Sequence, residues 1–305
     1  MKIVFMGTPD FGVVALNKLI EAHEVILVVS QPDRKIGRKR ILTPSPIKEV
    51  ALENNIDVFQ PENIKENYQT IIDSEPDIII TAAYGQFVPT QVLDCPKYGA
   101  INVHASLLPK YRGGSPIHSA IKNGDEYSGV SIMYMVKKMD AGDILSQVKV
   151  RIEKDDTALS MFSKLGLVGS DLLLETLISI EADDLTLTKQ DQSLVTYAHN
   201  IKRTDEKINW NLTANGIDCH VRGYHSWPGT FTEINGQIIK IYPGQIVNKN
   251  GLPGEILSIS NDGILVGSSE LSYLITDFQV QGKKRMKIKD FLNGNKLLFV
   301  GDFFR

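Results

Sequence analysis

The sequence predicts an α/β protein built from two domains, and three observations support this. Over residues 1–181, short β-branched runs alternate with segments of helical period, which is typical of a mostly parallel sheet. Residues 229–266 instead hold short apolar runs separated by turn pairs such as Asn235-Gly236, which predict antiparallel strands. The length of 305 residues also favours two domains over one. We therefore expect a Rossmann-like sheet with helices on both faces, followed by a small OB-like β-barrel.

The elements of the first domain follow from the spacing of its apolar residues. The pattern predicts helices over residues 11–22, 45–54 and 157–181 and strands over residues 2–6, 24–30, 78–82, 100–104, 130–135 and 145–152. Residues 182–206 are polar and irregular, which is typical of a linker. We expect the first domain at residues 1–188, a linker to about residue 206, and the C-terminal domain at residues 207–305.

The composition places the chain among folded soluble proteins, with 42% hydrophobic and 23% charged residues. Its longest apolar run, at residues 77–83, is well short of the ~18 residues that a membrane span needs. Residues 1–7 are typical of a first strand rather than a signal peptide. Cys95 and Cys219 are far apart and lack metal-ligand spacing, which indicates a reducing compartment. We expect a cytoplasmic protein without a metal site.

Positive charge is concentrated in two segments, although the net charge is −3. Residues 31–48 hold six basic residues and one acidic residue, and residues 283–289 hold five basic residues. Such clusters can contact nucleic-acid phosphates. A solvated surface is the alternative interpretation of both.

The turn at residues 7–12 lies where a dinucleotide-binding fingerprint would lie, between the first strand and the first helix. Pro9 occupies the position of the second glycine, which lets a pyrophosphate approach the backbone. This argues against a nicotinamide dinucleotide and favours a tight structural turn.

The strongest functional signal is the strand at residues 100–104. Asn102 and His104 are two residues apart on it and face the same side. The strand ends where open α/β sheets bind ligands, although a lone histidine there is often structural. Asp140, in a turn after the next strand, could reach this point and stabilise a cationic imidazole, although it could instead cap its own turn. Because the sequence lacks a nucleophile elbow, we expect direct attack by an incoming nucleophile.

These three residues, with the run at residues 106–113 between them, resemble the signature of formyltransferases that use 10-formyltetrahydrofolate. Residues 7–11, 31–38, 44–48, 208–210 and 227–229 are similar to the methionyl-tRNA formyltransferase family, so the resemblance spans nearly the whole chain. It implies that Asn102 and His104 donate to the oxyanion, while Asp140 sets the protonation of His104 and helps to remove protons from the amine. It further implies that the folate lies against a loop of four residues: Ser106, Leu107, Leu108 and Pro109.

The resemblance also implies the substrates. The donor would be 10-formyltetrahydrofolate, and the acceptor would be the α-amino group of initiator methionyl-tRNA, with a role in translation initiation. The basic loop would enter the end of the acceptor stem, Arg38 being the inserted arginine and Arg34, Lys39 and Arg40 lying beside it. Family members often have Gly-Arg-Gly where this chain has Gly-Arg-Lys at residues 37–39. We expect a monomer.

Several alternatives remain open at this point. A formyltransferase for a nucleotide-linked amino sugar or for glycinamide ribonucleotide would share the three residues, but neither explains the basic loop. A formyltetrahydrofolate hydrolase would also share them, with water replacing the amine. A non-catalytic RNA-binding protein would leave Asn102, His104 and Asp140 unexplained. Tyr84 and Gln86 are only candidates for the pterin pocket.

Overall fold

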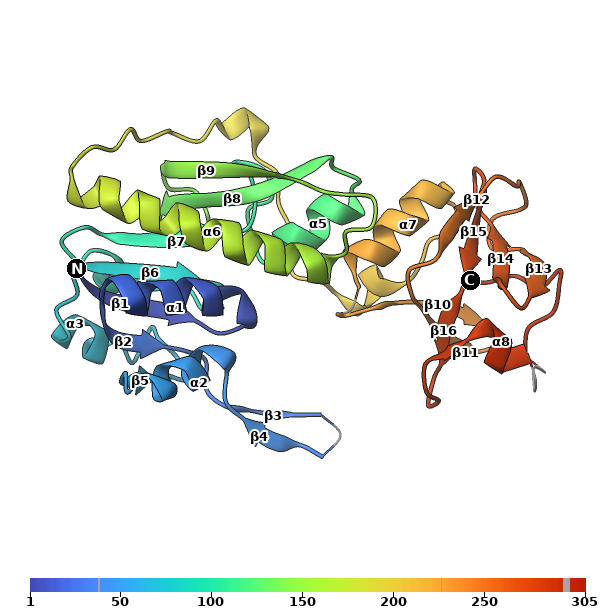
Figure 1. Cartoon of the computed structure of the whole chain (residues 1–305), viewed down its shortest axis with the longest axis horizontal. Coiled ribbons are helices and arrows are strands. Elements are labelled where there is room, and N and C mark those ends of the chain that lie inside the picture. The colour runs from blue at the N-terminus through green and yellow to red at the C-terminus, as the bar shows by residue number, and fades with distance from the viewer. Residues whose placement is uncertain (38, 226, 293–296) are drawn as a thin grey trace. The chain divides into compact units, whose positions relative to one another are not determined.

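A computed structural model describes residues 1–37, 39–225, 227–292 and 297–305. The chain forms two compact units (Figure 1). The first comprises Met1–Gly113, Ser128–Arg151 and Phe162–Ala198, and the second comprises Gly114–Tyr127, Ile152–Met161 and His199–Arg305. The predicted division at residues 188–207 stays a prediction. In the part of the chain that the structure describes, no helix combines the length and apolar character of a bilayer span.

The first unit contains a seven-stranded sheet in the order β5-β2-β1-β6-β7-β8-β9. Neighbours from β5 to β7 are parallel, and β8 joins β7 antiparallel. The prediction of a mostly parallel sheet is therefore confirmed. The strands are β1 (Lys2–Gly7), β2 (Glu24–Val29), β5 (Val58–Phe59), β6 (Ile78–Ala82), β7 (Ala100–His104), β8 (Tyr127–Tyr134) and β9 (Ile144–Arg151).

Helices cover both faces of this sheet, as the sequence predicts. Val4 and Met6 of β1 pack in one cluster with Ile71 of α3 and Val92 of α4. Phe5 points to the opposite face. There Gly12 lies so close to the Phe5 ring and to Ile47 of α2 that a Cβ on Gly12 would contact both. The helices are α1 (Val13–Ala22), α2 (Pro46–Glu53), α3 (Gln69–Asp73), α4 (Thr90–Leu93) and α6 (Ala158–Glu181), and a 3₁₀ turn η1 (Asp10–Gly12) precedes α1.

The second unit holds the C-terminal antiparallel strands that the turn pairs predict. One sheet has the order β10-β11-β16-β17 and the other the order β12-β15-β14-β13, and a single apolar cluster that includes Trp210 and Phe278 takes side chains from both. The strands are β10 (Thr230–Ile234), β11 (Gln237–Ile241), β12 (Gln245–Val247), β13 (Ile256–Ser260), β14 (Gly263–Gly267), β15 (Ser272–Ile275), β16 (Asp277–Val280) and β17 (Met286–Lys287), and α8 (Ile288–Leu292) follows them.

Several elements are absent from the sequence-based prediction, among them β5, α3 and α4 of the first unit. Residues 34–43 form the hairpin β3 (Arg34–Ile36) and β4 (Ile41–Thr43) instead of an irregular loop. The second unit contains α5 (Pro116–Lys122) and α7 (Ala214–Gly223). The two helices are in contact, since Nδ1 of His118 in α5 lies 2.8 Å from the carbonyl oxygen of Gly223 in α7. Their start signals are a proline in the first turn of α5 and the Thr213 cap of α7, and both helices are short, with seven and ten residues.

Candidate active site

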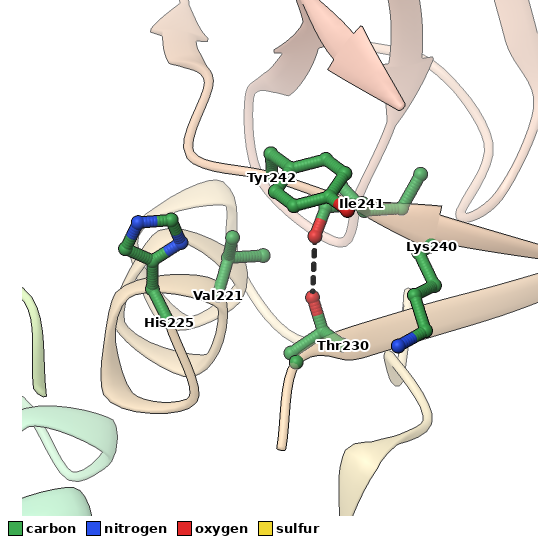
Figure 2. A pocket seen from close by; sticks show the side chains of 7 residues that line it. Val221, His225, Thr230, Lys240, Ile241 and Tyr242 are labelled. Atoms are coloured by element: carbon green, nitrogen blue, oxygen red, sulfur yellow. Dashed lines mark hydrogen bonds between the residues drawn. The ribbon is translucent and has the colours of Figure 1, made fainter. Parts of the chain in front are cut away.

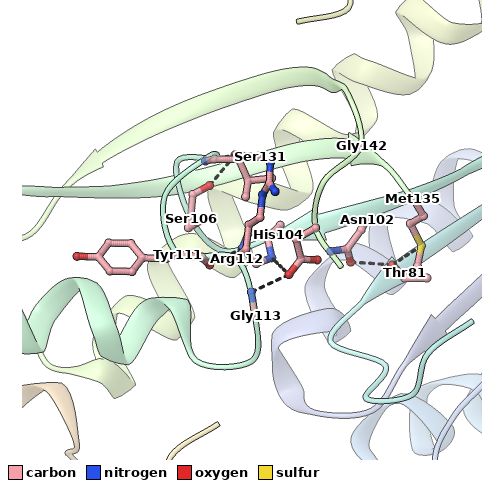
Figure 3. Close-up of polar contacts among 12 residues, drawn as sticks. Thr81, Asn102, His104, Ser106, Tyr111, Arg112, Gly113, Ser131, Met135 and Gly142 are labelled. Carbon is pink, nitrogen blue, oxygen red and sulfur yellow. Dashed lines mark hydrogen bonds and ion pairs between the residues drawn. The ribbon is translucent and has the colours of Figure 1, made fainter. Parts of the chain in front are cut away.

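His104 and Asp140 meet at the carboxyl end of β7, and Figure 3 shows His104 there. His104 is the last residue of this strand, and Asp140 lies in the loop between β8 and β9. Nδ1 of His104 is 3.8 Å from Oδ2 of Asp140, and their side chains are only 6% and 15% exposed. The structure therefore brings together two of the three residues that the sequence singles out, in an environment where charges interact strongly.

The tautomer of His104 follows from its second contact. Nε2 lies 3.0 Å from the backbone carbonyl oxygen of Tyr111. A carbonyl only accepts hydrogen bonds, so Nε2 carries a proton. Nδ1 is thus the nitrogen that faces Asp140 and that can gain or lose a proton.

The backbone holds Asp140 in place. Its φ of +47° is in the left-handed region, and its Oδ2 accepts a 2.8 Å hydrogen bond from the amide of Gly113. Gly142, two residues further on, approaches β8 so closely that a Cβ would lie 1.8 Å from the Tyr134 carbonyl oxygen. The turn therefore requires glycine at residue 142.

Asn102 is oriented by a residue that the sequence analysis missed. The hydroxyl of Thr81 on β6 donates to Oδ1 of Asn102 at 2.7 Å, and these residues are partners in the parallel ladder. Because Oδ1 is occupied as an acceptor, the amide orientation is fixed and Nδ2 is left to donate. Thr81 is only 3% exposed, and a single polar residue within the apolar run at residues 78–82 is the signal that could have identified it.

The loop with Ser106, Leu107, Leu108 and Pro109 is held by hydrogen bonds within the loop region and to Ser131 of β8. Ser106 Oγ donates to the Lys110 carbonyl at 2.6 Å. Ser131 Oγ donates to the Ser106 carbonyl at 2.6 Å and accepts from the amide of Leu108 at 3.1 Å. Ser106 and Leu108 are 1% and 4% exposed, so their side chains serve the loop's own structure.

Tyr84 and Gln86 have different surroundings. Gln86 accepts from the amide of Ile64 at 3.0 Å and donates to the Pro61 carbonyl at 3.2 Å, so it stabilises a neighbouring loop. The Tyr84 hydroxyl is buried and has no hydrogen-bond partner among the described residues. Burial raises the pKa of Tyr84 to about 12, so this hydroxyl stays protonated.

The basic segment forms an exposed surface on the hairpin β3–β4. Arg34, Lys39 and Arg40 are exposed, and Arg38 lies outside the described residues. The hairpin also exposes three large apolar side chains, each about 60% exposed: Ile36, Ile41 and Leu42. The sequence analysis did not identify this apolar component, which is unusual for a merely solvated turn.

Lys48 differs from the other basic residues of this segment because it is paired. Its ammonium donates to Asp33 at 2.8 Å and to Gln60 Oε1 at 2.8 Å. The hydrogen bond from Lys48, together with one that Gln60 Nε2 donates to Asp33 at 2.8 Å, lowers the pKa of Asp33. Lys48 therefore fixes the base of the segment rather than offering a free charge.

The second unit carries a small basic hollow beside β10 and β11 (Figure 2). Its volume is about 30 Å³, and its polar lining comprises His225, Thr230, Lys240 and Tyr242. The guanidinium of Arg285 lies 4.0 Å from the centre of the Tyr242 ring, and burial, with the nearby charge of Arg285, lowers the pKa of His225. The hollow has room for one or two water molecules, so it is too small to be a substrate site.

Among the described residues, no three histidine, cysteine or acidic side chains are arranged to hold a metal ion. The groups that converge at the end of β7 are an imidazole, a carboxylate and a primary amide. This arrangement, on a mostly parallel α/β sheet, is typical of a group-transfer enzyme that stabilises an oxyanion and moves protons.

Comparisons with known proteins specify the class. The family profile described as "Formyl transferase" matches residues 1–177, and "Formyl transferase, C-terminal domain" matches residues 200–296. The chain is 47% identical to a methionyl-tRNA formyltransferase of Staphylococcus epidermidis over 98% of both chains. It is 48% identical to that of Bacillus cytotoxicus over 97% of this chain and 96% of the relative. The protein belongs to the formyl transferase family.

A solved structure shares the fold. The sugar 3N-formyl transferase WlaRD, determined in the presence of dTDP and 5-N-formyl-THF, superposes with a TM-score of 0.70 and 21% identity, over 93% of this chain and 99% of that chain. The predicted α/β fold with a C-terminal domain of antiparallel strands is thereby confirmed.

Proposed function

We propose that this protein transfers a formyl group from 10-formyltetrahydrofolate to the α-amino group of initiator methionyl-tRNA and so supports translation initiation. The observation that carries the proposal is the identity of 47–48%, over at least 97% of this chain, to relatives named methionyl-tRNA formyltransferase. The juxtaposition of Asn102, His104 and Asp140 supports it, since formyl transfer needs donors for an oxyanion and an acceptor for the protons of the amine.

Asn102 and His104 would stabilise the negative oxygen that forms when the amine attacks the formyl carbon. The Nδ2 group of Asn102 is free to donate because Thr81 occupies Oδ1. The proton on Nδ1 of His104 is the second donor, since Nε2 already donates to Tyr111. Each well-placed donor of this kind is worth roughly 3–4 kcal/mol of transition-state stabilisation.

Asp140 would stabilise the positive charge on His104 and accept a proton of the attacking amine, directly or through water. The bound folate would supply only the electrophilic formyl carbonyl and the leaving nitrogen. We assign contact with the folate to the loop formed by Ser106, Leu107, Leu108 and Pro109. Because two of these side chains are buried, that contact would use the loop backbone and the other two residues.

Positive charges would hold the tRNA. We assign Arg34, Lys39 and Arg40 on the hairpin, with Arg38, to contacts with the acceptor stem, because the described three are exposed. The exposed apolar side chains of the hairpin suit an RNA end with unpaired bases, since the narrow groove of A-form RNA excludes side chains elsewhere. Residues 283–289 would add phosphate contacts, which give affinity without sequence information.

This proposal extends to the organisation of the chain. Residues 1–188 would carry the chemistry, with a linker to about residue 206, and residues 207–305 would bind tRNA. The protein would act as a monomer in the cytoplasm.

The test measures formyl transfer from 10-formyltetrahydrofolate to charged initiator tRNA, with a nucleotide-linked amino sugar as the competing acceptor. We expect transfer to the tRNA, its loss in His104→Ala, and in Arg38→Ala a loss confined to the tRNA reaction. If the unaltered protein formylates only the amino sugar, or only releases formate, the family chemistry holds and the assigned acceptor is wrong.

A further inference from the structure

Arg112 lies between the two backbone groups that contact His104 and Asp140. The carbonyl of Tyr111, just before it, accepts from His104 at 3.0 Å. The amide of Gly113, just after it, donates to Asp140 at 2.8 Å. A displacement of the Arg112 backbone would therefore move the partners of both residues.

The side chain of Arg112 is completely buried, with 0% exposure. Its Nε and Nη2 donate to one atom, Oε1 of Gln190, at 3.0 and 2.7 Å. Within the described part of the chain, Nη1 has no hydrogen-bond partner and no carboxylate pairs with this guanidinium. A guanidinium keeps its charge when buried, so this arrangement is costly unless it serves a purpose.

Gln190 connects Arg112 to the turn that carries Asp140. Its Nε2 donates to the carbonyl of Asp140 at 2.9 Å and to that of Gly142 at 2.7 Å. Gln190 is itself only 7% exposed, and its bonds to Arg112 and to the Gly142 carbonyl are buried. The Gln190 amide thus contacts Arg112 through its oxygen and the turn of Asp140 through its nitrogen.

The segment around Gln190 also pairs with Arg112 through the backbone. The amide of Arg112 donates to the Thr196 carbonyl at 2.9 Å, and the amide of Ala198 donates to the Arg112 carbonyl at 2.8 Å. The two family profiles match residues 1–177 and 200–296. The segment at residues 190–198, which contacts Arg112 and the turn of Asp140, therefore lies between the two matched regions.

We propose that Arg112 and Gln190 are positioning residues, which fix the turn of Asp140 against residues 111–113 and so set the separation of Asp140 from His104. They act through other groups and touch no reacting atom. The turnover test below rests on the proposed function, whereas the spectroscopic test does not.

Two substitutions separate positioning from folding. Gln190→Glu keeps the side-chain volume and gives Arg112 a carboxylate, but it cannot donate to the carbonyls of Asp140 and Gly142. Gln190→Met removes every hydrogen bond of the side chain. The matched control is Gln192→Met in the same segment, because Gln192 is exposed and its side chain donates only to the Gln190 carbonyl.

We expect kcat per folded molecule to fall between about 10-fold and 100-fold in both Gln190 variants, because small misplacements of catalytic groups are that costly. KM for each substrate should change less than about threefold, since residues that touch no substrate contribute little to binding. Gln192→Met should stay within about twofold. If Gln190→Glu folds and keeps kcat within about twofold, or if both variants fail to fold, the positioning role is wrong.

The ring resonances of His104 give a readout that needs no substrate. We would record ¹⁵N-histidine spectra at one pH and assign His104 with the variant His104→Asn. The shifts should move in Gln190→Glu and stay in place in Gln192→Met. Unchanged shifts in Gln190→Glu would overturn the proposal even for an active enzyme, whereas moved shifts with no transfer to tRNA would overturn only the proposed function.

Discussion

Replacing Asp140 by asparagine removes one charge and little else. The remaining amide oxygen can still accept from the Gly113 amide, which now holds the carboxylate at 2.8 Å. The residue keeps its size, so the left-handed turn is undisturbed. Asp140→Asn therefore tests the electrostatic role of this residue apart from its role in the loop.

The magnitude follows from the separation of the charges. Two unit charges 3.8 Å apart interact with about 4 kcal/mol at an effective dielectric constant of about 20. The Asp140 side chain is 15% exposed, and solvent screening lowers this to about 3 kcal/mol. If the imidazolium is stabilised in the transition state, kcat should fall by about 100-fold.

Single-turnover formyl transfer to methionyl-tRNA, with enzyme in excess, measures this step without product release. Asp143→Asn, three residues further along the same loop, is the matched control and should keep at least half of the rate. A folded Asp140→Asn protein that retains more than a third of the parental rate would refute the electrostatic argument. The oxyanion would then depend on the Asn102 amide, because a neutral His104 that donates through Nε2 to Tyr111 has no proton on Nδ1.

Three further predictions concern the surroundings of the site and the stability of the second unit. Thr81→Val should reduce kcat about tenfold with unchanged folding, because the Asn102 amide loses its 2.7 Å anchor; a rate within twofold of the parent contradicts this. Gly142→Ala should lower the free energy of unfolding in urea by about 3 kcal/mol, since its Cβ would meet the Tyr134 carbonyl; a loss below about 1 kcal/mol would show that the turn adapts. Burial lowers the pKa of His220 to about 4 in the folded protein. As pH decreases from 6.5 to 4, this histidine therefore binds a proton in the unfolded chain but not in the folded one. The free energy of unfolding should fall by about 3 kcal/mol over this range. His220→Gln should remove that part of the acid sensitivity. If the free energy of unfolding falls with pH equally in the variant and the parent, His220 is not the cause.

The sequence predicts those parts of the fold that depend on local periodicity. The β-branched runs identify β6 and β7 to the residue. The two-residue period of a strand then predicts that Asn102 and His104 share one side, because this geometry is independent of the tertiary structure. The position of Asp140 could be predicted only as within reach, since loop conformation is not locally encoded.

The missed residues depend on contacts that are distant in the sequence. Thr81 contacts Asn102 only because β6 and β7 are neighbours in the sheet. Gln190 is 78 residues from Arg112 and lies in a segment that the composition marks as a linker. No periodicity identifies such a residue. A glutamine in a polar stretch is normally exposed, and only its 7% exposure distinguishes it.

The contact with Tyr111 determines how His104 and Asp140 act together. A backbone carbonyl cannot donate, so Nε2 keeps its proton whether the ring is neutral or charged. Every proton that His104 gains or loses is therefore on Nδ1, the atom 3.8 Å from Asp140. Loss of that proton leaves a lone pair facing a carboxylate, and its return restores an attractive pair. A perturbation that separates Asp140 from Nδ1 of His104 should therefore impair both the oxyanion donor and the acceptor of the amine proton.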